Sequence, residues 1–399
     1  MGLMRNFSYE DKLFMSEFAI ITLVFAAISV YAVSLTFVIN SAHIPSFYLG
    51  MFFAVALLSF FVLNPISNEY IVRYGNLFSL PISVLSMAIS FVLVYISQNV
   101  LVISLSIIIL SLSFTMFYNS AVKRGEKFVM NVPLTYFSAA SGSFAGLILS
   151  SFFRGPVYDM YAYFSIILLI MGLLTIFFIT KKSQNKPEKH DVLSIMMRPF
   201  YVMEKVNRSN KKLLLLADSL NEVFLAISVG SAFPFIFATG IDTGMARNEI
   251  FAVTAFSGII AILAILLYNI FRNEKSTMYY PAKNVIVTVA LFLFFMMSQY
   301  SFIAAILICS LLPASYLSSD NFLKLQFPED FNYKEITSFL RNPIMIISPI
   351  MGMIMWIVGR HTLFTMAIAF SILSFAVTII VIENAKFFGI SKQTIRAEE

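Results

Sequence analysis

The sequence is poor in charge and in cysteine. Charged residues make up 12% of its 399 residues and hydrophobic residues 59%, whereas a soluble globular chain carries about 25% charged residues. So little polar surface excludes an ordinary soluble domain. Cys309 is the only cysteine, so no intramolecular disulfide can form, and the three histidines are scattered without metal-ligand spacing. We therefore expect a membrane protein with no metal site and no cofactor.

Several motifs of other protein classes are also absent. No Gly-x-x-x-x-Gly-Lys-Ser/Thr loop is present, which argues against ATP-driven chemistry. A membrane prenyl- or acyltransferase would need an Asp-rich metal motif or a His-Asp pair at a membrane edge. No Asp-rich motif occurs and none of the apolar runs contains a histidine, so we expect no enzyme. No folded basic face is visible, so we expect no nucleic-acid partner. The polar first 15 residues and the long run Phe18–Ile39 differ from a cleavable signal, whose apolar core has about 7–15 residues.

What is present is a series of twelve apolar runs, each long enough for a spanning helix of about 20 residues. The runs are 17–40, 46–66, 76–97, 99–118, 129–152, 157–180, 214–238, 249–271, 279–298, 299–318, 336–358 and 362–383. The third and fourth runs are separated only by "SQN", and the ninth and tenth only by "SQYS". Each fused run would be too long for one span, so we expect a tight polar hairpin at both places.

Lysine and arginine predict the orientation of these helices, because cytoplasmic segments are enriched in them. With both termini inside, 24 of the 27 basic residues fall on inner segments, and only Arg154, Arg247 and Arg360 fall outside. We predict a multi-pass protein of the cell membrane with cytoplasmic N- and C-termini. The positive net charge is thus a topology signal.

The longest inner segment, 181–213, separates six helices from six. We predict an N-terminal six-helix bundle at 1–180, a cytoplasmic linker at 181–213, and a C-terminal six-helix bundle at 214–399. Within the linker, "DVLSIMMRPFYVMEKV" fits either an interfacial helix or a solvated strip near anionic lipid.

The two halves also repeat each other in sequence. "AISV" occurs at 27–30 and at 226–229, and "FAVALLS" at 53–59 corresponds to "FAVTAFS" at 251–257. In "NVPLTYFSAASG" and "RNPIMIISPIMG", a proline, a serine and a glycine recur at an offset of 210. Corresponding helices begin on the same side, so the halves are parallel repeats, which is the organisation of major facilitator transporters.

Over essentially its whole length the chain resembles the major facilitator superfamily, as a divergent member. The resemblance rests on the six-plus-six helices, the basic central segment and the loop after the second helix. That family carries Gly-x-x-x-Asp-Arg-x-Gly-Arg/Lys in this loop. Here the stretch reads "NEYIVRYGN", which keeps Arg73 and Gly75, has Val72 where the Asp would stand, and offers Glu69 one turn earlier as a substitute gate residue.

The resemblance implies an all-α integral membrane fold of twelve helices and a secondary active transporter. Such a protein would move a small organic solute by alternating access, coupled to protons, as a monomer in the lipid bilayer. A multidrug/proton efflux antiporter and a non-transporting sensor or partner protein of the same fold are the alternatives.

The acids Asp218 and Glu222 in "LADSLNEVFLAISV" are the strongest candidate site. Their spacing of four places both on one helix face. At about 1.5 Å per residue, Glu222 lies roughly 15 Å beyond Lys212, near the middle of a hydrocarbon core about 30 Å thick. Burial raises a carboxyl's pKa, which suits proton uptake near neutral pH. For each acid, a role in proton coupling or solute binding stands against a structural ion pair at the inner face.

Arg341 is the predicted partner of Asp218, since both lie at a similar depth and the resemblance makes their helices neighbours. A snorkelling arginine is the alternative. The helices that line the central cavity in the family add Tyr31, Ser34, Asn221, Ser310 and Ser315 as polar candidates for solute contact, each with an intramembrane hydrogen bond as the alternative. Gly230 and Pro234 are candidates for a hinge in the seventh helix.

Overall fold

The computed structural model describes residues 9–74, 76–121, 128–129, 132–179, 212–271, 280–326 and 333–398. The chain divides into two compact units. The first comprises Met1–Ser46, Val55–Glu188 and Gly244–Asn269, and the second comprises Phe47–Ala54, Lys189–Thr243 and Ile270–Glu399. Each unit is described by itself.

Helices make up the first unit, together with one short hairpin. Its elements are α1 (Tyr9–Ser41), most of α2 (Tyr48–Tyr74), α3 (Asn76–Ile96), α4 (Val100–Ala121), β1 (Phe128–Val129), β2 (Val132–Pro133), α5 (Leu134–Ser151), α6 (Val157–Ile179) and most of α10 (Arg247–Phe271). Strands β1 and β2 pair antiparallel directly before α5. The apolar runs form helices because a helix satisfies its own backbone hydrogen bonds where lipid offers none.

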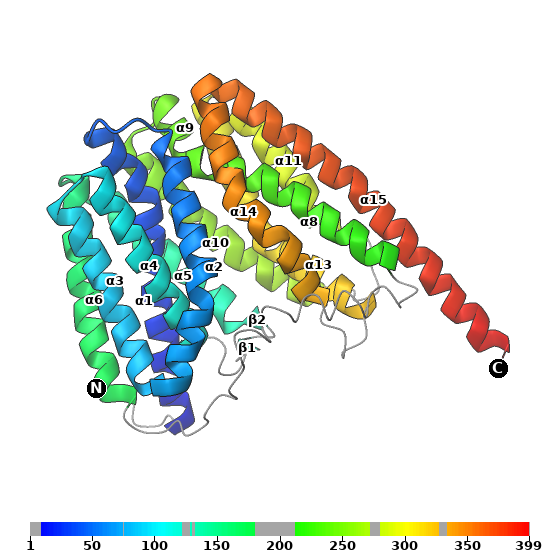
Figure 1. Cartoon of the computed structure of the whole chain (residues 1–399), viewed down its shortest axis with the longest axis horizontal. Coiled ribbons are helices and arrows are strands. Elements are labelled where there is room, and N and C mark those ends of the chain that lie inside the picture. The colour runs from blue at the N-terminus through cyan, green and yellow to red at the C-terminus, as the bar shows by residue number, and fades with distance from the viewer. Residues whose placement is uncertain are drawn as a thin grey trace. The chain divides into compact units, whose positions relative to one another are not determined.

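All regular secondary structure in the described residues of the second unit is helical. Its elements are α8 (Lys212–Ala232), the 3-10 turn η1 (Phe233–Phe235), α9 (Ile236–Asp242), α11 (Ala282–Phe295), α12 (Gln299–Cys309), α13 (Leu312–Gln326), α14 (Tyr333–Val358) and α15 (Arg360–Glu398). In Figure 1, α8, α14 and α15 run side by side, in agreement with their contacts.

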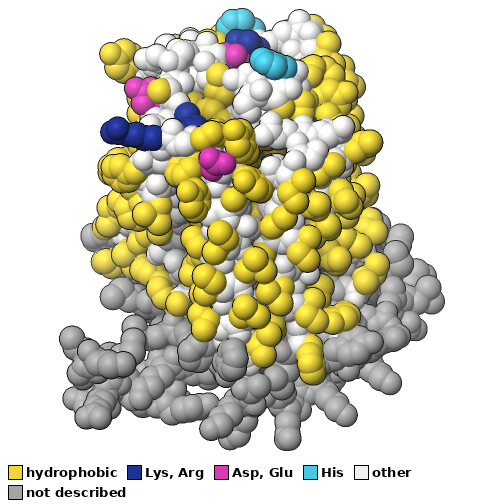
Figure 2. Space-filling view, turned by 90° about the vertical axis from the view of Figure 1, so that its left-hand side faces the viewer, with side chains coloured by type: hydrophobic (Ala, Val, Ile, Leu, Met, Phe, Trp, Pro, Cys, Tyr) yellow, Lys and Arg dark blue, Asp and Glu magenta, His cyan; other side chains and the backbone are white. Residues whose placement is uncertain are grey.

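The predicted twelve-helix architecture is confirmed. Nine helices in the described residues are long and apolar enough to cross a membrane, and Tyr48–Asn64, Phe137–Ser151 and Ala282–Phe295 are shorter apolar helices. Both predicted hairpins are present, because α3 ends at Ile96 before α4 begins at Val100, and α11 ends at Phe295 before α12 begins at Gln299. Hydrophobic side chains are spread over the described part of the face in Figure 2, and few charged side chains are seen there, as expected of a surface that lies against lipid.

The internal repeat is visible in the packing of each unit. In the first unit, α1 packs against α5 and α6, and α3 against α4 and α6. In the second unit, the corresponding helices make the same pairs: α8 packs against α14 and α15, and α11 against α12, α13 and α15. The sequence repeat therefore reflects two bundles built on one plan.

Repeated glycines allow the closest of these helix contacts. A Cβ placed on Gly142 of α5 would lie 2.9 Å from the Ala26 nitrogen of α1. A Cβ on Gly352 of α14 would lie 2.9 Å from the Cα of Ser231 on α8. The two glycines occupy equivalent positions in the repeat and serve equivalent helix pairs, as small residues do in membrane helix packing.

Two of the twelve spans are interrupted. The seventh breaks after α8 at Pro234, where the sequence predicted a hinge candidate, and continues through η1 into α9. The tenth, predicted as continuous, is two helices, α12 and α13. Pro313 lacks the N–H that would bond the Cys309 carbonyl four residues earlier, and α12 ends at Cys309.

Candidate functional site

Asp218 and Glu222 lie on the same buried face of α8. Asp218 is 0% exposed and Glu222 is 8% exposed. Helix α8 packs against α14 and α15, and side chains of this face also reach α11, all within the second unit. A carboxylate at this depth is costly unless it is paired, hydrogen-bonded or protonated, so the partners of the two acids define the site.

Glu222 lies between two cations. Lys283, in the first turn of α11, donates from Nζ to Glu222 Oε1. On α14, Arg341 Nη1 lies 3.6 Å from Glu222 Oε2. The side chains of Lys283, Glu222 and Arg341 are 1%, 10% and 37% exposed. The carboxylate thus joins a fully buried cation to a partly exposed one.

The buried ammonium of Lys283 also faces aromatic rings. Its Nζ lies 5.4 Å from the centroid of Tyr280 and 5.6 Å from that of Tyr316. Negative ring faces stabilise a cation that has left water. Lys283 is therefore held by one ion pair and two cation–π contacts, which accounts for a lysine inside a membrane bundle.

Asp218 has different partners. The Tyr280 hydroxyl donates to Asp218 Oδ1 at 2.5 Å, and Asn221 Nδ2 donates to the same hydroxyl at 3.3 Å. The other oxygen, Oδ2, is buried without a hydrogen-bond partner among the described residues. Asp218 is thus bonded to a neutral hydroxyl, whereas Glu222 is bonded to cations.

Asn221 connects three helices at the centre of this network. Its Oδ1 accepts from Asn284 Nδ2 at 2.8 Å, from Ser374 Oγ at 2.6 Å and from Thr378 Oγ1 at 3.2 Å. Asn284 Nδ2 also donates to Ser374 Oγ at 2.6 Å. Because Asn284 is on α11 and Ser374 and Thr378 are on α15, Asn221 ties α8 to both helices.

The other predicted polar residues lie apart from this network. The Tyr31 and Ser106 hydroxyls are 2.8 Å apart in the first unit, and Ser34 Oγ donates to the Val30 carbonyl at 2.5 Å. Ser310 and Ser315 donate to carbonyls of their own segments, those of Leu307 at 2.5 Å and Leu312 at 2.8 Å. All four predicted side chains are buried and make intramembrane hydrogen bonds.

The predicted gate residues are near the end of α2, where the structure leaves several side chains undescribed. Gly75 and the side chains of Glu69 and Arg73 lie outside the described residues. The linker 181–213 lies outside them too, except Lys212 and Leu213 at the start of α8.

Arg341 does not pair with Asp218 in this structure, contrary to our prediction. Its acidic partner is Glu222, one turn further along α8, while Asp218 faces Tyr280. The reason is the direction of the side chains: Asp218 faces Tyr280, just before α11, whereas Glu222 reaches both Lys283 on α11 and Arg341 on α14.

Sequence reasoning missed Lys283 and Asn284. Lys283 was counted with the inner-loop charges, although it lies inside the apolar run 279–298. The position of Lys283 in a spanning segment predicts an acidic partner, because a lysine at membrane depth must be paired. Asp218 and Glu222 on the seventh helix are the candidates for that partner. No group of three or more His, Cys, Asp or Glu side chains that could hold a metal ion occurs in the described parts of the chain.

Comparisons by sequence return nothing: no known protein family and no curated protein matches this chain. Comparisons of structure return transporters. A point mutant of the nucleoside transporter NupG aligns at a TM-score of 0.74, with 11% identity over 93% of this chain and 99% of the other. The human organic anion transporter MFSD10 aligns at 0.58 with 11% identity, over 93% of this chain and 100% of the other.

A bacterial homologue of the human lysosomal transporter Spinster, in an inward-facing and occupied conformation, aligns at a TM-score of 0.61. It is 12% identical over 97% of each chain. Likeness at such low identity extends to the fold alone, and it covers nearly the whole length of these three proteins. This chain is a multi-pass membrane protein with the fold of the major facilitator transporters.

Proposed function

We propose that the chain is a secondary active transporter of a small organic solute, with proton uptake at Glu222 as the coupling step. The fold supports transport, because proteins of this fold with similar length move nucleosides and organic anions. In this proposal 1–180 and 214–399 are two bundles that rock about a central solute site, with 181–213 as their linker. The termini are cytoplasmic, as the distribution of basic residues predicts.

The observation that carries the coupling step is the position of Glu222 between Lys283 and Arg341. A proton on Glu222 cancels the charge that holds both cations. Arg341, the more exposed of the two, is then free to change partner, while Lys283 stays buried. A change of ion pairs between α8 and α14 is a two-state device of the kind that alternating access requires.

Glu222 is the more accessible of the two acids, and a proton needs a path to its acceptor. The cations beside Glu222 oppose its protonation, so proton uptake there has to coincide with the loss of Arg341 as a partner. The Glu222 side chain is 10% exposed beside a partly exposed arginine, whereas Asp218 is 0% exposed. We propose that Asp218 and Asn221 hold the cytoplasmic parts of α8, α11 and α15 together.

A flux experiment tests the proposal. Purified protein in vesicles should concentrate its solute when a pH gradient is imposed, and Glu222→Gln should abolish that accumulation, because an amide cannot release a proton. Because Glu222→Gln removes the carboxylate partner of the buried Lys283, thermal unfolding first verifies that the variant folds. Exchange without a gradient should survive in the folded variant, since the amide keeps a similar shape. Nucleosides and small organic anions, scored by thermal stabilisation of the protein, are the first solutes to screen.

The matched control is Glu249→Gln, the same change at an acid that caps α10 by accepting from Ala246 N at 2.8 Å. It should leave gradient-driven accumulation intact. Accumulation that persists in Glu222→Gln would move coupling elsewhere, with Asp218→Asn the next variant. A protein that binds a solute without moving it would support the non-transporting sensor alternative.

A further inference from the structure

A cavity of about 460 Å³ lies in the second unit where α9 ends and α15 begins. It is at the opposite end of the unit from the start of α8, the end that the basic residues predict to be extracellular. Its lining consists of Asp242, Thr243, Met297, Trp356, Gly359, Arg360 and His361. The volume is within the range of about 300–1,000 Å³ of small-molecule sites, and none of the polar network around Glu222 lines it.

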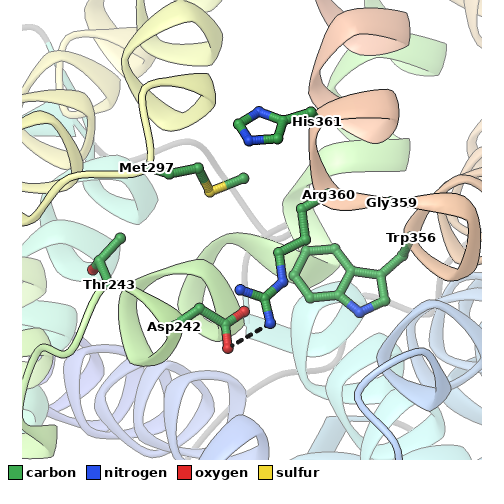
Figure 3. A pocket seen from close by; sticks show the side chains of 7 residues that line it. All are labelled: Asp242, Thr243, Met297, Trp356, Gly359, Arg360 and His361. Carbon is green, nitrogen blue, oxygen red and sulfur yellow. Dashed lines mark ion pairs between the residues drawn. The ribbon is translucent and has the colours of Figure 1, made fainter.

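The centre of the cavity is the Arg360 guanidinium. Figure 3 shows it between Asp242 and the ring of Trp356. Arg360 Nη2 lies 3.0 Å from Asp242 Oδ1, and the guanidinium lies 5.5 Å from the Trp356 ring centroid. Trp356 in turn stacks on Phe235 at 4.7 Å with an interplanar angle of 15°. The guanidinium is thus oriented by a carboxylate on one side and by a fixed aromatic stack on the other.

This guanidinium is open to a ligand. The side chains of Arg360 and Asp242 are 48% and 24% exposed, and the structure gives Arg360 one carboxylate partner, through one of its nitrogens. A guanidinium has five N–H donors in a planar fork that matches the two oxygens of a carboxylate. An anion can therefore bind Arg360 beside Asp242 or displace it.

The remaining lining residues favour a ligand with a planar apolar part. His361 and Met297 lie on the far side of the cavity from Asp242 (Figure 3). His361 is held edge-on to Phe295 at a centroid distance of 5.0 Å, so its ring has a fixed place. A methionine thioether and an imidazole make favourable contacts with an aromatic ring.

We propose that this cavity binds a small organic anion, a carboxylate on a planar aromatic ring, with Arg360 bonding the carboxylate and His361 and Met297 contacting the ring. Arg360 supplies the positive charge, and Asp242 is the single acid of the lining. In the absence of the anion, the ion pair with Asp242 holds the guanidinium in place. The proposal goes beyond the proposed function, because binding here requires neither transport nor a proton gradient.

Trp356 makes the proposal directly testable, because it is the only tryptophan of the chain. Benzoate should change the tryptophan fluorescence of the purified full-length protein along a saturating curve at constant ionic strength. Benzamide, which has the ring without the charge, should give no saturating change. Equal responses to the two probes, or a benzoate response that does not saturate, would overturn the proposal.

Variants test the role of the guanidinium. Arg360→Gln should weaken benzoate binding at least tenfold, while Arg154→Gln, the same change at an exposed arginine of the other unit, should leave it unchanged. Asp242→Asn removes the competing carboxylate and should bind benzoate at least as tightly as the natural chain. This second variant covers the case in which Arg360→Gln does not fold. Weaker binding in Asp242→Asn, or unchanged binding in Arg360→Gln, would contradict the assignment.

Discussion

At the scale of single residues, the buried polar groups of the second unit are held in place by partners on other helices. Lys283, Glu222 and Asn221 are each at most 8% exposed, and each contacts a side chain far away in the sequence. Buried charges of this kind are tolerated only in pairs, and removing one partner leaves the other uncompensated. The stability of the unit should therefore depend on the pair as a whole.

Lys283→Met should destabilise the protein by at most about 3–5 kcal/mol, the usual cost of breaking a buried ion pair, because Glu222 then keeps Arg341 as its only cationic partner among the described residues. The double variant Lys283→Met/Glu222→Gln should recover much of the loss, because neither side chain then carries an unpaired charge. Thermal unfolding in detergent, read as a double-mutant cycle, measures both effects. Lys212→Met, at an exposed lysine of the same unit, is the control, and an equal loss there would argue against a specific pair.

The acids of the site could be predicted from the sequence, but their partners could not. Asp218 and Glu222 are conspicuous because they interrupt an apolar run at helical spacing. Which cation each would meet depends on how α8 rotates against α11 and α14, and a difference of one turn decides between Asp218 and Glu222 for Arg341. Spacing along one helix contains no information on that rotation.

At the scale of elements, the helices were the most predictable feature, since each apolar run must satisfy its backbone within itself when it lies in lipid. Breaks were less predictable. A proline in the seventh span ends a helix and the prolines Pro343 and Pro349 lie inside the continuous α14, so the residue type alone does not locate a break. A proline leaves one helix carbonyl without its hydrogen bond, and the neighbouring helices determine whether that carbonyl finds another partner.

The glycines of the repeat give a prediction at this scale. Gly142→Ala and Gly352→Ala should each destabilise the protein by about 1–3 kcal/mol, because the added methyl meets the backbone of the partner helix. Gly172→Ala should cost less, since its methyl would meet the movable side chain of Leu85 at 2.6 Å. Thermal unfolding of the three variants in the same detergent ranks them, and an equal or reversed ranking would reject close backbone packing as the reason for these glycines.

At the scale of the whole molecule, the hydrophobic surface predicts that the helices lie in a bilayer, and the distribution of basic residues predicts which end faces the cytoplasm. Large side chains such as Leu101, Phe152 and Ile270 are 77%, 76% and 72% exposed. So much exposed apolar surface on so many helices is unfavourable in water but not in lipid. This surface places the helices in a bilayer without indicating which end faces the cytoplasm. Only the lysines and arginines predict that direction.

Orientation can be tested with single cysteines, since the chain has only Cys309 to replace. In a Cys309→Ala background, Asn248→Cys places an exposed thiol in the first turn of α10, on the predicted outer side. Gln184→Cys places a cysteine in the segment predicted to be the cytoplasmic linker. A membrane-impermeant maleimide should label the first in intact cells and the second only after permeabilisation. Both substitutions leave every lysine and arginine in place, so the signal that sets the topology is unchanged. Labelling of Gln184→Cys in intact cells, with Asn248→Cys protected, would reverse the orientation and would put the cavity at Arg360 on the cytoplasmic side.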